Sequence, residues 1–134
     1  MQSVVSIWLK CNLSSHSFIS AAYWKGNIAL LREQLPRSEV YVYLEGCEIA
    51  AFAGLSGDYI AGLFVRAESR SKGIGSELVE HIRQRHAKLS LAVYKKNDRA
   101  VKFYLREGFR IDGEQTDTST KEEEFVMRWE RQKG

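Results

Sequence analysis

The sequence predicts one α+β domain, in which a mixed but mostly antiparallel sheet carries helices on both faces. The chain has 134 residues, of which 44% are hydrophobic, enough for one core but too few residues for two ordinary domains. Short apolar segments of strand type and longer segments of helical period alternate along it, separated by turns that contain glycine. We expect the following order along the chain: two helices, three strands, a helix, a strand, a helix and two strands. All of them belong to a single domain over residues 1–134.

The first half of the chain is predicted to form two helices and three antiparallel strands. Apolar positions between Ser3 and Asn12 fit a short helix. A second helix is expected over residues 21–35, where Pro36 stops it. Strands follow at residues 40–44, 47–55 and 59–65. Because tight turns join these strands, they are expected to pair antiparallel.

The second half alternates between helices and strands. A polar, glycine-bearing segment after Val65 leads into a helix whose apolar face is formed by Ile74, Leu78, Val79 and Ile82. A strand over residues 89–94 and a helix that starts at Asn97 or Asp98 and ends at Gly108 come next. Residues 109–112 and 125–129 are the last predicted strands.

Charge and composition exclude several classes of function. No apolar stretch approaches the roughly 20 residues needed to span a bilayer, and the N-terminal residues lack the pattern of a signal peptide. Cys11 and Cys47 show neither metal-ligand spacing nor a disulfide framework. We therefore expect a cytoplasmic protein with no metal and no membrane partner. Residues 66–110 hold twelve basic and five acidic side chains, which indicates an anionic partner such as a polyphosphate cofactor or a nucleic acid.

The segment over residues 70–75, Arg-Ser-Lys-Gly-Ile-Gly, is the strongest local signal. A strand that runs through a glycine-bearing turn into a helix leaves backbone N–H groups free to bind phosphate oxygens. Gly73 and Gly75 let a pyrophosphate approach the backbone, and Arg70 and Lys72 add positive charge. The segment lacks the Gly-Lys-Ser/Thr of a P-loop and the third glycine of the dinucleotide fingerprint.

A second motif, Asn-Asp-Arg-Ala-Val-Lys-Phe-Tyr over residues 97–104, follows the next strand and precedes Gly108-Phe109. The pair, Arg-x-x-Gly-x-Gly before a helix and Asn-x-x-Ala-x-x-Phe-Tyr-x-x-x-Gly-Phe after the next strand, resembles the GNAT superfamily of acyl-CoA-dependent N-acetyltransferases. The resemblance covers residues 40–109, and the order of elements agrees as far as Trp129. Residues 16–24 are also similar to small stand-alone bacterial members of that superfamily.

The resemblance implies a binding mode for acetyl-CoA. The strand over residues 63–65 would separate from the strand over residues 91–93, so that the backbone of Phe64 and Val65 pairs with the pantetheine arm like an added strand. Backbone N–H groups at the start of the following helix would hold the pyrophosphate. Lys102 and Arg106 are candidates for the nucleotide phosphate, although a solvated basic face explains them equally well. The implied cofactor-binding residues are Leu63, Phe64, Val65, Arg70, Ser71, Lys72, Gly73, Ile74, Gly75, Ser76, Asn97 and Tyr104.

The implied reaction is direct attack of a neutral primary amine on the thioester in a ternary complex. A base or a chain of waters removes the ammonium proton, and an acid protonates the leaving thiolate. Tyr104 matches the family tyrosine near the thioester sulfur and is the catalytic candidate. Some members place a glutamate base where this chain has Ala92, which leaves four candidates for the base: His16, Glu45, Asp58 and Tyr59.

The sequence leaves the acceptor open between a protein lysine, a protein N-terminus and a small-molecule amine. A non-catalytic acyl-CoA-binding module is the alternative, and an enzyme directed at RNA or aminoacyl-tRNA ranks last because no RNA-binding motif is found. Many members of the superfamily begin with a strand, whereas this sequence starts almost at a helix. We expect either that the first strand is short or missing, or that the given start lies inside the natural reading frame. An unpaired neighbouring strand would favour a homodimer.

Overall fold

The computed structural model describes residues 2–34, 38–70 and 72–131. A 3-10 turn (Ala67–Ser69) lies between the third strand and the fourth helix. The other elements, in chain order, are α1 (Gln2–Ser15), α2 (Ala21–Gly26), α3 (Ile28–Gln34), β1 (Glu39–Glu45), β2 (Glu48–Ser56), β3 (Tyr59–Val65), α4 (Ile74–Arg83), β4 (Lys88–Tyr94), α5 (Asp98–Arg106), β5 (Arg110–Thr116) and β6 (Glu123–Glu130).

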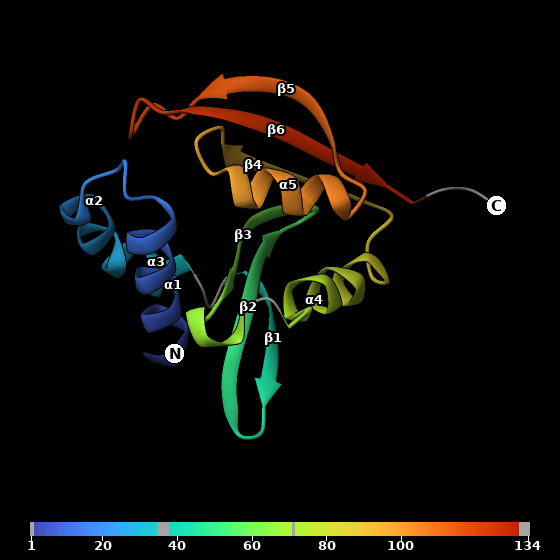
Figure 1. The fold of residues 1–134 in the computed structure, drawn as a ribbon, viewed down its shortest axis with the longest axis horizontal. Helices are drawn as coiled ribbons and strands as arrows, with labels where there is room; N and C mark the ends of the chain where they lie inside the picture. Colours follow the sequence, from blue (N-terminus) through green and yellow to red (C-terminus); the bar gives the residue numbers. More distant parts are fainter. Residues whose placement is uncertain (1, 35–37, 71, 132–134) are drawn as a thin grey trace.

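The strands form one sheet of six in the order β1-β2-β3-β4-β6-β5 (Figure 1). Strands β3 and β4 pair in parallel, and the other four neighbouring pairs are antiparallel. The parallel pair is joined through α4, as a crossover between parallel strands requires. The predicted mixed, mostly antiparallel sheet is confirmed.

Helices cover both faces of the sheet, as predicted. In Figure 1, α1, α2 and α3 lie together on one side, and α4 and α5 lie on the other. The predicted apolar face of α4 is fully buried in the main core, which it shares with residues of β2, β4 and β6. On the opposite face, Val4, Ile7 and Cys11 of α1 pack against Phe52, with Phe64 at the margin of this cluster. Strands β2 and β3 therefore separate two apolar layers.

Three elements differ from the prediction by more than two residues. The second helix is not continuous: it breaks at Asn27, whose side-chain Nδ2 donates to the carbonyl of Tyr23 at 2.6 Å and so competes with the helical pattern. The predicted end of this helix at Leu35 and Pro36 lies outside the described residues. Helix α1 extends to Ser15 instead of Asn12, and β5 extends through a bulge near Gly113 to Thr116.

Strand β1 forms one edge of the sheet. It exposes Val42 at 46% and Leu44 at 57%, both of them apolar. An exposed apolar edge is open to pairing with another strand, so the homodimer remains a prediction. Among the helices in the described part of the chain, none is long and apolar enough to cross a membrane.

Candidate functional site

A cavity of about 300 Å³ opens beside the end of β3, between α1, α4 and α5. Its volume lies in the range of small-molecule sites. Its wall comes from four parts of the chain that are distant in sequence. These residues are Cys11, Ser15 and His16; Leu63, Phe64 and Val65; Ser69, Arg70, Gly73, Ile74, Gly75 and Ser76; and Asn97, Arg99, Ala100, Phe103, Tyr104 and Arg106.

The cavity lies where β3 and β4 separate. The two strands pair only at Tyr59 with Ser90 and at Ile60 with Leu91, although both continue beyond these positions. The last residues of β3 therefore have no partner on the β4 side. The predicted separation of these strands is present in the structure.

Backbone groups at the end of β3 face this opening. The carbonyl of Val65 accepts bonds from the Cys11 thiol at 3.1 Å and from Nε of Arg70 at 3.3 Å. The next amide, that of Arg66, donates to Ala50 on the β2 side at 2.8 Å. Along a strand, the N–H and C=O groups of successive residues point to alternate sides. Those of Arg66 and Phe64 therefore point to β2, and those of Leu63 and Val65 point to the opening.

By the same alternation, the Phe64 peptide groups face β2. Phe64 and Phe52 are paired in that ladder. Phe64 therefore lines the cavity, but its peptide groups do not face the opening as expected, whereas those of Leu63 and Val65 do. The pairing register of β2 and β3 determines which residues face the opening, and the sequence pattern does not show this register.

The N-terminus of α4 presents free amide groups to the cavity. Gly73 at the N-cap has a φ of 77°, a left-handed conformation that favours glycine, and no side chain caps the helix. The first helical bond runs from the amide of Glu77 to the carbonyl of Gly73 at 3.1 Å. The amides of residues 74–76 consequently lack helical partners, and these three residues line the cavity. The positive end of the helix dipole adds to their attraction for an anion.

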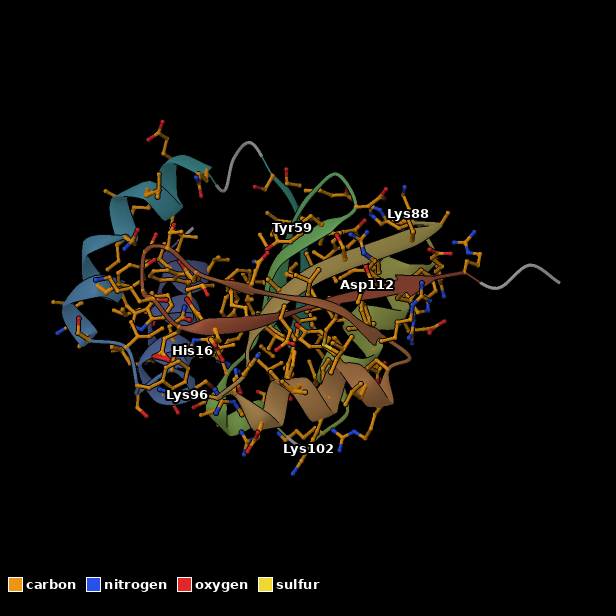
Figure 2. The ribbon with its side chains drawn as sticks, turned by 90° about the horizontal axis from the view of Figure 1, so that it is seen from above. His16, Tyr59, Lys88, Lys96, Lys102 and Asp112 are labelled. Atoms are coloured by element: carbon orange, nitrogen blue, oxygen red, sulfur yellow. The ribbon has the colours of Figure 1, made fainter. Side chains whose placement is uncertain are left out.

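Arginines supply the charge on the cavity wall. Arg70, Arg99 and Arg106 line it, and among the described residues that do so none is Asp or Glu. Lys72 is instead exposed and lies 3.7 Å from a carboxylate oxygen of Glu45. Lys102 projects from the outer side of α5, away from the cavity (Figure 2). Ser71, the remaining predicted residue of this loop, lies outside the described residues.

Tyr104 of α5 lines the cavity and is 7% exposed. Its ring packs edge-on against Phe103 and Phe109, with centroid distances of 5.2 and 5.5 Å. Burial raises the pKa of its phenol, so the hydroxyl stays protonated at neutral pH. No hydrogen bond to this hydroxyl is found within the described part of the chain. The phenol proton is thus available to a ligand.

Of the four candidates for the general base, only His16 lies at the cavity. Glu45 accepts a hydrogen bond from Ser69 at 2.5 Å, and Asp58 contacts His86 at 2.8 Å, so both carboxylates have other partners. Tyr59 is 43% exposed at the start of β3, and Ala92 does not line the cavity. Burial lowers the pKa of His16 to about 4, which makes its imidazole a weak base.

The sequence reasoning assigned no ligand role to six wall residues: Cys11, Ser15, Ser69, Arg99, Ala100 and Phe103. The helical period already placed Phe103 near the apolar face of its helix, but only the packing shows that it contacts Gly75. A Cβ added at Gly75 would lie 3.2 Å from the Phe103 ring. Cys11 and Ser15 come from the N-terminal helix, and no local pattern relates that helix to residues 70–76.

Two separated strands beside an uncapped, arginine-flanked helix terminus define a class of protein that binds an extended ligand carrying phosphates. The sequence matches the model of the acetyltransferase (GNAT) domain over residues 36–111. The chain is 31% identical over 131 residues to the peptidyl-lysine N-acetyltransferase YiaC of Escherichia coli (strain K12). The aligned residues make up 96% of this chain and 90% of that protein.

A second relative is the peptidyl-lysine N-acetyltransferase YjaB of the same organism. It is 33% identical over 113 residues, or 84% of this chain and 77% of that protein. The solution structure of the apo form of YjaB from Escherichia coli is similar to this fold, with a TM-score of 0.85 and 28% identity. The similarity covers 98% of this chain and 91% of the other.

The chain therefore belongs to the GNAT family of acetyltransferases. It is an acyl-CoA-dependent N-acetyltransferase, which moves an acetyl group from acetyl-CoA to a primary amine. The comparisons do not favour a non-catalytic binding module or an enzyme directed at RNA.

Proposed function

We propose that this enzyme acetylates lysine side chains of proteins and that the cavity beside β3 holds acetyl-CoA for that reaction. The observation that carries the binding site is the uncapped terminus of α4, whose free amides line a cavity with three arginines. The acceptor class is supported by the peptidyl-lysine acetyltransferases to which the chain is similar over most of its length. A cytoplasmic location fits its two free cysteines, Cys11 and Cys47, and the bacterial relatives fit a bacterial origin.

Different groups of cavity residues fit different parts of acetyl-CoA. The amides of Ile74, Gly75 and Ser76 bind the diphosphate, and the absence of a Cβ at Gly73 keeps their approach open. The peptide groups of Leu63 and Val65 bind the amides of the pantetheine arm.

Arg70 changes partner in this proposal. It now donates to the Val65 carbonyl at 3.3 Å, which is the group that a pantetheine amide would bind. When the arm replaces it there, the guanidinium becomes free to turn toward the phosphates, for which its planar fork of donors is suited. Arg99 and Arg106 supply further positive charge from α5.

Tyr104 is the general acid in this proposal. Its raised pKa keeps the phenol protonated, and its hydroxyl has no competing partner among the described residues. It can therefore donate to the thiolate that leaves as the amine attacks. The acceptor lysine must lose a proton first, since its unperturbed pKa is about 10.4. With no carboxylate on the described cavity wall and a weakly basic His16, we assign that proton to water at the cavity mouth.

The test combines calorimetric titration of acetyl-CoA with an assay of thiol release on a lysine-containing peptide. Arg106→Ala removes a charge from the cavity wall and should weaken acetyl-CoA binding about tenfold, the low end for a charge-assisted contact. Lys102→Ala is the matched control, one turn away on the outer side of α5, and should leave the affinity within about twofold.

Mass spectrometry then identifies the acetylated atom of the peptide. Acetyl groups on lysine Nζ support the proposal. Turnover confined to small-molecule amines contradicts the acceptor class, and equal effects of the two substitutions contradict the binding site.

A further inference from the structure

A directed chain of hydrogen bonds joins α1 to the start of α5 along the cavity wall. The side-chain Nδ2 of Asn12 donates to the carbonyl of Trp8 at 2.9 Å, and Asn12 Oδ1 lies 2.8 Å from Nδ1 of His16. On the other edge of the imidazole, Nε2 lies 3.0 Å from Nδ2 of Asn97. Asn97 Oδ1 in turn accepts the amide of Ala100 at 3.3 Å and caps α5.

These contacts determine which imidazole nitrogen carries the proton. Asn12 Oδ1 can only accept, so Nδ1 of His16 must be the donor. Asn97 Nδ2 can only donate, so Nε2 must offer its lone pair. With these assignments each of the four contacts joins a donor to an acceptor, which fixes the orientation of both asparagine amides. One N–H of Asn97 Nδ2 is left over for a ligand.

The surroundings of His16 keep its ring neutral. It packs against the rings of Trp24 and Tyr94 at centroid distances of 5.5 and 5.0 Å, on the side of the N-terminal helices (Figure 2). Burial there lowers the pKa of the imidazole. A protonated ring would also turn a second N–H toward the donor group of Asn97. The ring is therefore built to accept from Asn97 and does not suit the role of a base.

We propose that His16 is a positioning residue, which holds the Asn97 amide in the orientation that binds the pantetheine arm of acetyl-CoA. This inference rests on the proposed cofactor site, because His16 and Asn97 both line that cavity. Without an acceptor at Nε2, only the bond from the Ala100 amide at 3.3 Å still distinguishes the oxygen of Asn97 from its nitrogen, and the amide turns over more readily. The N–H offered to the ligand is then lost in part of the molecules.

Two substitutions separate the two edges of the imidazole. In His16→Gln, the side-chain oxygen can take the place of Nε2 and still accept from Asn97. In His16→Asn, the shorter amide can take the place of Nδ1 and still donate to Asn12, while the acceptor for Asn97 is lost. Comparing the two variants therefore measures the contact with Asn97 at similar loss of ring packing.

The kinetic experiment measures KM for acetyl-CoA and kcat with a lysine peptide. His16→Asn should raise KM about tenfold with a smaller change in kcat, whereas His16→Gln should restore KM to within about threefold of the native value. In an Asn97→Ala background, His16→Asn should have no further effect on KM. Equal KM values for the two variants, or an undiminished effect without the Asn97 side chain, would overturn the proposal.

A measurement on the native protein does not depend on the folding of any variant. Nitrogen-15 NMR of the imidazole at pH 7 should show a protonated Nδ1 and an unprotonated Nε2 for His16, and the opposite tautomer would overturn the proposal. Failure of the cofactor site is a distinct result, since the native protein would then not bind acetyl-CoA. If native binding is intact and His16→Asn leaves KM unchanged, only the positioning role is wrong.

Discussion

Replacing Gly75 with aspartate and, separately, with asparagine tests the anion site through charge alone. The two side chains have nearly the same shape, and a Cβ at this position meets the Phe103 ring at 3.2 Å in both variants. Both replacements therefore share the cost of moving that ring by a few tenths of an ångström. They differ by one negative charge next to the free amides of α4.

The size of the charge effect follows from Coulomb's law. A carboxylate about 5 Å from a diphosphate that carries about two charges is repelled by about 1.7 kcal/mol in water and by about 6.6 kcal/mol at an effective dielectric constant of 20. Because the cavity is open to solvent, we expect about 3 kcal/mol between these limits, which is about a 100-fold difference in Kd. The added charge itself should not destabilise the fold, because an acidic residue in the first turn interacts favourably with the helix dipole, by about 0.3–1 kcal/mol.

The assay is calorimetric titration of acetyl-CoA into both variants, with thermal unfolding as the check on folding. The aspartate variant should bind about 100-fold more weakly than the asparagine variant at low salt, and the difference should shrink as ionic strength rises. Equal Kd values in two folded variants would refute the placement of the diphosphate at α4.

Two further predictions concern Tyr104 and His16. Tyr104→Phe removes a hydroxyl without a partner in the described part of the chain, so the melting temperature and the Kd for acetyl-CoA should change little while kcat falls about 100-fold; an unchanged kcat would remove Tyr104 from the acid role. The folded-state pKa of His16, about 4, lies below its unfolded value of about 6.5, so the unfolded chain binds more protons in this window and stability falls as pH falls from 6.5 to 4. The full shift corresponds to about 3 kcal/mol, which the partial exposure of the ring reduces to about 2 kcal/mol. In urea titrations at several pH values, the free energy of unfolding of His16→Gln should lose this part of its dependence on pH. A pH dependence equal to that of the native protein would contradict the assigned pKa.

Local sequence patterns predicted most of the fold because they report local physics. The apolar face of α4, from Ile74 to Ile82, recurs with the helical period and is fully buried in the structure. Gly46 and Gly57 have positive φ values in the turns between β1, β2 and β3, where glycine was expected to mark turns. The break of the second helix was not predicted, because the competing bond from the Asn27 side chain has no signal in the apolar pattern.

The candidate site was only partly predictable, because parts of its wall meet only through packing between elements that are distant in the sequence. Residues 70–76 and 97–104 are continuous motifs, and the structure brings most of them to one cavity. The exposed side chain of Lys72 lies instead 3.7 Å from a carboxylate oxygen of Glu45 on β1, a contact that a local motif does not reveal. The contributions of Cys11, Ser15 and His16 depend on how α1 packs against the end of β3.

The central claim is that the amides at the start of α4 bind the diphosphate of acetyl-CoA. Amide NMR spectra recorded while acetyl-CoA is added to the native protein test this claim most directly. The account predicts that the largest downfield shifts fall on Ile74, Gly75 and Ser76, as their N–H groups gain charged acceptors. Saturable binding that leaves these three signals in place would contradict it.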